Sequence, residues 1–245
     1  MLLNIVNPNT TAAMTATIAK AAEQAARSGT RICAVNAAFG PPSIEGPYDD
    51  AFAVPGLIAR IREGDAEGAS AHVIACFDDT GLDAARAAAR APVVGIGEAA
   101  FHVATLLAHR FAVVTTLTRS VAVIEDNLAR YGLARRCVRV RASDVPVLAL
   151  DDPASDARSK IAAEIARALG EDGAEAIVLG CAGMADLAAS LSSEFAVPVI
   201  DGVAAAVMLA EGLAALGLKT SRRGGYAHPL AKDYAGLLAP FSPKA

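Results

Sequence analysis

The chain has 245 residues, of which 54% are hydrophobic and 20% are charged, a balance that suits one large α/β domain or two smaller ones of similar build. A formal net charge of −4 and an aromatic content of 4% argue against nucleic acid as a partner, because the chain lacks both a basic surface and stacking side chains. Its apolar runs are interrupted too early for a bilayer span of about 20 residues. We expect no membrane segment and, without a secretory signal pattern, a cytoplasmic location.

Strand and helix patterns alternate along the first half of the chain. A short apolar run is followed by the turn Asn7-Pro8-Asn9-Thr10-Thr11 and by an Ala-rich helix that ends near Gly29. The alternation predicts a parallel sheet covered by helices. Within the second predicted helix, Pro55 marks either a break or the true first turn. Predicted strands cover residues 2–6, 31–37, 71–77 and 92–98, and further predicted helices cover 51–68, 82–91 and 99–109.

The pattern then starts again after His109. Residues 110–132 repeat the order of strand, Thr-rich turn and helix, and Cys181, like Cys76, ends an apolar strand. Such a repeat predicts two pseudo-symmetric, Rossmann-like parallel-sheet domains, with an active site in the cleft between equivalent loops. We expect the C-terminal segment to return as a helix onto the first domain. The predicted α/β domains are 1–98 with 206–245, and 99–205.

The two repeated cysteines suggest acid–base chemistry. Backbone amides at the start of a helix can lower the pKa of a thiol from its usual value of about 8.5, and small residues follow both Cys76 and Cys181. A thiolate on one wall and a thiol on the other can remove a proton from a stereogenic carbon and return one to the opposite face. The polar turns 7–11 and 115–120 would border the cleft and stabilise the negative charge that develops on substrate carbonyl oxygens.

Other patterns favour structural roles or exclude cofactors. The four cysteines form no C-x-x-C pair and the histidines show no zinc-site spacing, so no metal is expected. The G-x-G-x-x-A pattern at 95–100 lacks the acidic residue of a dinucleotide site and favours close packing of a strand on a helix. Cys33 and Cys137 are expected in the core at mid-strand positions, and Asp79 or Thr80 is expected to cap the helix that follows.

Five motifs resemble those of the hydantoin racemases of the aspartate/glutamate racemase superfamily, over nearly the whole chain. They are NPNTT at 7–11, PPSIEG at 41–46, ACFDDTGLDAAR at 75–86, VVTTLTRS at 113–120 and LGCAGM at 179–184. The resemblance implies cofactor-independent racemisation of 5-monosubstituted hydantoins by Cys76 and Cys181 in a homo-oligomer, with a small molecule as substrate. It also implies a set of substrate-binding residues: Asn9, Thr118, Ala182 and Gly183 at the ring, Ile44 and Phe77 near the 5-substituent, and Thr80.

Several alternatives stay open. The allantoin racemases share both cysteine motifs. Amino-acid racemases of the superfamily must bind an α-carboxylate, for which Arg119 is the one cationic residue expected near the cleft. An arylmalonate-type decarboxylase is disfavoured, because that type typically lacks one of the two cysteines. Outside catalysis, a bilobal binding protein for a small ring compound would explain the cleft, with thiols that are incidental.

Overall fold

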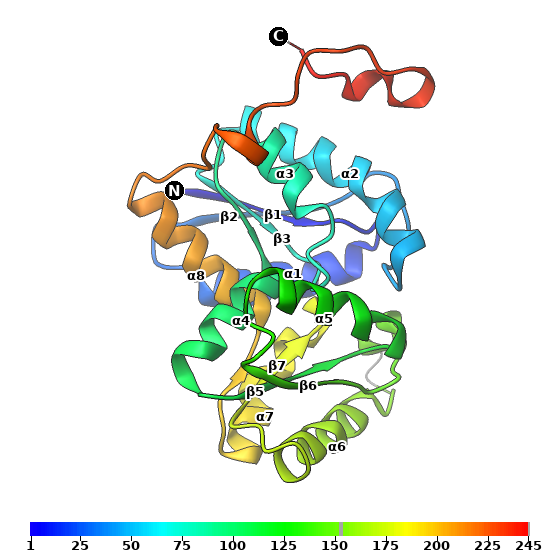
Figure 1. Ribbon diagram of the computed structural model, residues 1–245, viewed down its shortest axis with the longest axis vertical. Coiled ribbons are helices and arrows are strands. Elements are labelled where there is room, and N and C mark those ends of the chain that lie inside the picture. The colour runs from blue at the N-terminus through cyan, green and yellow to red at the C-terminus, as the bar shows by residue number, and fades with distance from the viewer. Residues whose placement is uncertain (152–153, 245) are drawn as a thin grey trace.

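The computed structural model describes residues 1–151 and 154–244 and contains two parallel four-stranded sheets in separate halves of the molecule (Figure 1). The strands are β1 (Leu2–Asn7), β2 (Arg31–Asn36), β3 (Ala71–Ile74), β4 (Val93–Gly95), β5 (Phe111–Thr115), β6 (Cys137–Ala142), β7 (Ala176–Gly180) and β8 (Val199–Ile200). The first sheet has the order β2-β1-β3-β4 and the second β6-β5-β7-β8. Because both halves share one strand order, the predicted pair of pseudo-symmetric α/β units is confirmed.

Helices connect the parallel strands, as crossover connections require. Every residue of the central strands β1, β3, β5 and β7 is buried, as expected for parallel strands covered on both faces. The helices are α1 (Ala12–Ala25), α2 (Pro47–Ala66), α3 (Leu82–Ala88), α4 (Ile96–Leu107), α5 (Val121–Arg130), α6 (Ala157–Gly170), α7 (Ala188–Phe195) and α8 (Gly202–Ala215). Short 3₁₀ helices cover Thr118–Ser120, Val147–Asp151, Ala182–Leu187, Gly224–Tyr226 and Gly236–Phe241.

The two halves share one hydrophobic core. Side chains of the first sheet, such as Ile5, and of the second, such as Val178, belong to the same cluster of buried residues. Phe101 of α4 is a fully buried member of this cluster, with its ring centroid 5.4 Å from that of Phe77 and 6.1 Å from that of Phe111. This aromatic contact connects the loop after Cys76 to the first strand of the second sheet, and it holds the two halves together beside the cleft.

The helix α2 differs from its prediction. It begins at Pro47 and continues through Pro55, which marks neither a break nor the first turn. Pro47 suits the first turn, where its missing N–H has no partner to lose, and Asp49 and Asp50 complement the helix dipole there. Burial of Leu57 against the first sheet favours helix over the cost of an interior proline, about 3 kcal/mol.

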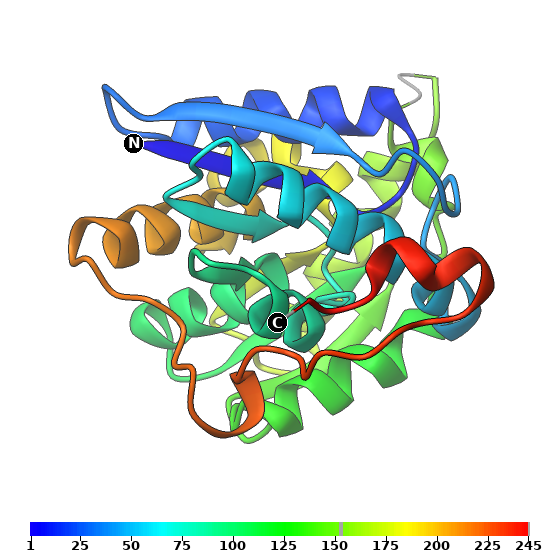
Figure 2. The same ribbon diagram turned by 90° about the horizontal axis from the view of Figure 1, so that it is seen from above.

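The C-terminal region begins as a helix and then becomes irregular. The helix α8 packs on α1 and α4. Beyond Ala215 the chain passes along the outside of the first half, where Tyr226 donates a hydrogen bond to Asp83 of α3 at 3.0 Å and Arg62 of α2 donates to the carbonyl of Phe241 at 3.2 Å (Figures 1 and 2). The predicted boundaries between the two domains stay a prediction. Within the described residues, no helix is long and apolar enough to cross a membrane.

Candidate active site

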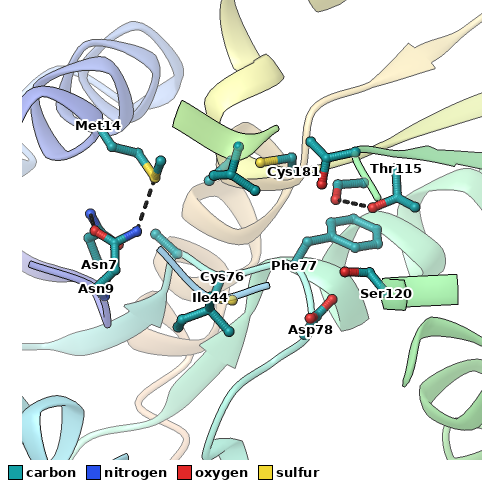
Figure 3. Close-up of a pocket in the computed structure, with 15 residues that line it drawn as sticks. Asn7, Asn9, Met14, Ile44, Cys76, Phe77, Asp78, Thr115, Ser120 and Cys181 are labelled. Carbon is teal, nitrogen blue, oxygen red and sulfur yellow. Dashed lines mark hydrogen bonds between the residues drawn. The ribbon is translucent and has the colours of Figure 1, made fainter. Parts of the chain in front are cut away.

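The carboxyl ends of the central strands of both sheets meet at one narrow cavity (Figure 3). Its free volume is about 40 Å³, room for about three water molecules. In parallel sheets, ligands bind at this end of the strands because the loops that follow them converge there. The residues that line the cavity are the strand-end residues Asn7 of β1, Thr115 of β5 and Gly180 of β7, and the following residues Asn9, Met14, Ile44, Ala75 to Asp78, Thr116, Ser120, Val147, Cys181 and Ala182.

Cys76 lies in the loop after β3 with two hydrogen-bond donors at its sulfur. The Thr80 hydroxyl donates to Sγ at 3.4 Å, and the backbone N–H of Asp78 also donates to it. Burial raises the pKa of the Cys76 thiol, and the Asp78 carboxylate and Cys181 raise it further, while the two donors act in the opposite direction. Cys76 is therefore held as a thiol, with donors already in place for its thiolate.

Cys181 comes directly after β7 in extended conformation and precedes a 3₁₀ turn. The strand end before it is held close to β5: the Thr115 hydroxyl donates to the Gly180 carbonyl at 3.0 Å, and a Cβ on Gly180 would lie 2.8 Å from Cβ of Thr115. Only glycine permits this approach, which fixes the backbone directly before Cys181. Both cysteines line the same cavity.

Asp79 caps a helix, but not the one that follows it. Its carboxylate accepts hydrogen bonds from the backbone N–H groups of Gly97 at 3.0 Å and Glu98 at 2.8 Å, in the first turn of α4, and from the Tyr131 hydroxyl at 2.8 Å. The helix α3 has Gly81 at its N-cap and no side-chain cap. The prediction that Asp79 or Thr80 caps this helix is wrong, because sequence proximity does not show which helix start lies closest in space.

The glycines of the G-x-G-x-x-A pattern make this capping contact possible. A Cβ on Gly95 would lie 2.1 Å from the Asp79 carboxylate, and one on Gly97 would lie 2.4 Å from the Phe77 carbonyl oxygen. The loop that carries Cys76 therefore rests directly on the start of α4. The pattern therefore serves close packing, but of the cysteine loop on the start of α4 and not of a strand on a helix as predicted.

Asn9 presents an amide at the cavity. Its Oδ1 accepts from the Asn7 side chain at 2.8 Å and from the Thr11 backbone N–H at 2.9 Å, which fixes the plane of the amide. Its Nδ2 points to the sulfur of Met14 at 3.1 Å (Figure 3). A thioether is a weak acceptor, so this N–H can turn to a carbonyl oxygen of a bound molecule at little cost.

The structure brings together six of the nine residues predicted for the site. Those that line the cavity are Cys76, Cys181, Asn9, Ile44, Phe77 and Ala182. Thr80 lies behind the Cys76 sulfur, and Gly183 lies behind Cys181, where a Cβ would be 3.8 Å from Sγ. Thr118 is exposed and donates to Asp144 at 2.8 Å. Their roles stay predictions.

The sequence offered no signal for Met14 or Val147, which reach the cavity from a helix and a 3₁₀ turn. Asp78 stood in the Cys76 motif without an assigned role. Cys137 is the first residue of β6, not a mid-strand residue as predicted, whereas Cys33 lies inside β2. Among residues 1–151 and 154–244, no three His, Cys, Asp or Glu side chains gather as metal ligands would.

Comparisons with known proteins agree with this architecture. The sequence model of the Asp/Glu/Hydantoin racemase family matches residues 3–210. The chain is 50% identical to a hydantoin racemase of Rhizobium meliloti over 96% of this chain and 98% of that protein. It is 46% identical to a hydantoin racemase of Pseudomonas sp. (strain NS671), over 98% and 97% of the two chains.

Solved structures of racemases and related enzymes are similar to this chain as well. An allantoin racemase from Klebsiella pneumoniae superposes with a TM-score of 0.97 at 48% identity, covering 100% of both chains. Two less similar structures share the fold. An arylmalonate decarboxylase is 19% identical with a TM-score of 0.60, over 92% of this chain and 97% of that one. An aspartate racemase homologue from Pyrococcus horikoshii is 17% identical with a TM-score of 0.62, over 87% of this chain and 98% of that one. The chain belongs to the Asp/Glu/Hydantoin racemase family and is an isomerase of the racemase type.

Proposed function

We propose that this protein racemises 5-monosubstituted hydantoins without a cofactor, with Cys76 and Cys181 as the two acid–base groups. The observation that carries the proposal is that two thiols, each directly after an equivalent strand of its sheet, line one narrow cavity. The relatives named hydantoin racemases, at 46% and 50% identity over nearly the whole chain, support the substrate class. The expected homo-oligomer and cytoplasmic location also stay predictions.

The proposed reaction breaks one C5–H bond and forms another. One cysteine thiolate takes the proton from C5 and becomes a thiol; the electron pair delocalises onto the adjacent carbonyl oxygen, and the second thiol gives its proton to the opposite face. Asn9 Nδ2 is a donor for the oxygen that becomes negative, as are the hydroxyls of Thr116 and Ser120, which make no hydrogen bond to another described residue. For the other enantiomer the thiols exchange roles.

The lining also bears on the alternatives. It contains no Lys or Arg, and Arg119 is exposed and outside the lining, so the described residues offer no cation for the α-carboxylate of an amino acid. A neutral ring with carbonyl groups suits amide and hydroxyl donors better. Ile44, Met14 and Val147 also line the cavity and provide apolar contacts for the substituent.

The test is loss of optical activity of an enantiopure 5-benzyl- or 5-isobutyl-hydantoin in D₂O, with C5 deuteration followed by NMR. We expect racemisation with deuterium incorporation and no added cofactor. Cys76→Ser and Cys181→Ser should each abolish it, whereas Cys33→Ser and Cys137→Ser, in β2 and β6, serve as matched controls that should keep it. A fully active Cys181→Ser enzyme would exclude the two-thiol mechanism.

Allantoin is the second candidate substrate, because the Klebsiella allantoin racemase structure superposes over the whole chain. It carries a polar ureido group at the same ring carbon, so the chemistry is unchanged and only the fit of the substituent differs. We expect kcat/KM to be higher for an alkyl or benzyl substituent than for ureido, because Ile44, Met14 and Val147 are apolar. If neither substrate reacts, the enzyme proposal fails and the binding-protein alternative takes its place.

A further inference from the structure

The Asp78 carboxylate connects the reaction cavity to a second, polar opening. Asp78 lines the cavity of the two cysteines and also a neighbouring cavity on the other side of its loop. That second cavity is bordered by Asp50 of α2, Asp83 of α3, and Asn127 and Arg130 of α5. Beside the cysteines, Asp78 is the only ionisable residue of the reaction cavity within the described chain.

The main chain of Asp78 is fixed while its carboxylate makes no bond. Its carbonyl oxygen accepts from the Asn127 side chain at 2.9 Å, and its N–H donates to the Cys76 sulfur. Within the described residues, no hydrogen bond or ion pair involves the carboxylate oxygens of Asp78. The adjacent Asp79, by contrast, uses its carboxylate to hold α4. Asp78 is thus the member of the pair that is available to accept and release a proton.

The charges around Asp78 are negative. Burial raises its pKa to about 7, with Asp50 on α2 and Asp79 on its own loop adding to the effect. At the outer rim, Arg130 forms an ion pair with Asp83. A carboxyl group with this pKa exchanges protons in both directions near neutral pH, which is the condition for efficient general acid–base transfer.

Racemisation by two thiols requires that the protonation states of both thiols be restored after each turnover. Each inversion leaves the two cysteines in the protonation states opposite to those in which it began, so the enzyme must reset before it acts on the same enantiomer again. When Cys76 has taken the C5 proton, it must release that proton to solvent, and Cys181 must gain one. Cys76 is only partly exposed, and Asp78, which lines both cavities, offers its proton a second route to water.

We propose that Asp78 is the proton relay of Cys76, carrying the thiol proton between the reaction cavity and the polar opening bordered by Asp50. This inference rests on the two-thiol function proposed above. In one direction the S–H bond of Cys76 breaks and an O–H bond forms on the Asp78 carboxylate, which then releases the proton to water in the opening. The reverse sequence recharges the thiol. Asp78 acts through Cys76 and does not itself remove the C5 proton.

The experiment compares Asp78→Ala with the wild type in racemisation at pH 7. We expect kcat to fall on the order of 100-fold with KM changed less than about twofold, because substrate contacts remain while proton transfer is slowed. Formate or acetate, small acids that can enter the polar opening, should restore the rate in proportion to their concentration. Asp78→Glu should retain more activity than Asp78→Ala. Asp156→Asn, an exposed carboxylate paired with Lys160 in the second half, is the matched control and should behave as wild type.

A second readout needs no substrate and separates this inference from the proposed function. The rate at which iodoacetamide alkylates Cys76, followed by peptide mass spectrometry, should have its pH midpoint shifted downward in Asp78→Asn, because the negative charge beside the thiolate is gone. If the wild type fails to racemise hydantoins but this shift occurs, the substrate proposal fails and the coupling of Asp78 to Cys76 stands. An unchanged midpoint, or a kcat loss that no added acid restores, would overturn the relay.

Discussion

The two cysteine loops occupy equivalent places in the two sheets but give their thiols different surroundings. After Cys76 the chain continues Phe-Asp-Asp-Thr-Gly, with a hydroxyl donor and two carboxyl groups, whereas after Cys181 it continues Ala-Gly-Met-Ala and begins a 3₁₀ turn. A repeated fold fixes where each thiol lies; the residues that differ between the repeats fix how each thiol exchanges its proton. The symmetry of the scaffold therefore does not predict equal behaviour of the two thiols.

The same contrast appears one element later. In the second half, Asp201 caps α8 from its own N-cap position, accepting from the N–H groups of Val203 at 3.0 Å and Ala204 at 2.8 Å. In the first half, Gly95 occupies the N-cap of α4, and the cap is supplied by Asp79 from the cysteine loop. The first half thus couples the position of its thiol to a helix start, and the second half does not.

The largest expected effect tests whether each thiol transfers protons at one face of the substrate carbon C5. Cys76→Ala and Cys181→Ala should each lower the racemisation rate by at least about 10³-fold, because one of two obligatory proton transfers is missing. The remaining thiol can still remove a C5 proton and return a deuteron from solvent to the same face. Each variant should therefore exchange C5 of one enantiomer only, and the two variants should prefer opposite enantiomers, as NMR in D₂O would show. Equal exchange of both enantiomers by one variant would contradict the assignment of one thiol to each face.

The two helix caps should differ in what their loss does. Asp201→Ala should lower the free energy of unfolding by about 1 kcal/mol, the usual value of an N-cap, with little change in kcat. Asp79→Ala also leaves the Tyr131 hydroxyl without its partner, so we expect a loss of about 2–3 kcal/mol and a fall in kcat, since the Cys76 loop is released. Urea unfolding and initial rates measure both; similar kinetic effects in the two variants would mean that the cap of α4 does not position Cys76.

The sequence was a better guide to the fold than to these contacts. Alternation of strands and helices, and a cysteine at the end of an apolar strand in each half, indicated the repeat, because these features are local in the sequence. The partner of Asp79 could not be predicted from spacing, since Gly97 lies 18 residues away and meets it only through the tertiary fold. Thr118 illustrates the limit of motif transfer: its motif borders the cavity, yet its side chain turns to Asp144.

The pH dependence of stability should reflect the acidic loop of the first half. Burial raises the pKa of both Asp78 and Asp79 to about 7, from 3.8 in an unfolded chain. The folded state therefore binds more protons between these values, and stability must fall as the pH rises from about 4 through about 7. Asp78→Asn should reduce the loss in free energy of unfolding between pH 5 and 7 by about 2 kcal/mol, measured by urea unfolding at each pH.

The opposite slope is expected in acid. Asp65, buried among donors that include His72, and Asp172, hydrogen-bonded to Arg141, have lowered pKa values, so their stabilising contributions are lost as the pH falls below about 4. Asp78→Asn should leave this acid limb unchanged. A variant whose stability keeps the wild-type slope between pH 5 and 7 would show that Asp78 is not the group that titrates there.

The smallest expected effect comes from a substitution that makes the Cys76 loop more like the Cys181 loop. Four residues after its cysteine, the first half has Thr80, whose hydroxyl donates to Cys76, while the second half has Ala185. Thr80→Ala removes that donor, which raises the pKa of Cys76 because the thiolate loses a hydrogen bond worth about 0.5–1.5 kcal/mol. We expect a roughly two- to tenfold lower kcat for the enantiomer whose proton Cys76 removes, and a higher pH midpoint for its alkylation by iodoacetamide.

Thr80→Ser keeps the hydroxyl and is the matched control for Thr80→Ala; it should stay close to wild type in both measurements. The direction of the reaction separates the explanations, because a general disturbance of the loop would slow both enantiomers, whereas loss of a thiolate donor slows the direction that begins with the Cys76 thiolate. Equal slowing in both directions would assign Thr80 to loop packing. Unequal slowing would mean that the asymmetry between the two loops, and not the shared fold, sets how easily each enantiomer reacts.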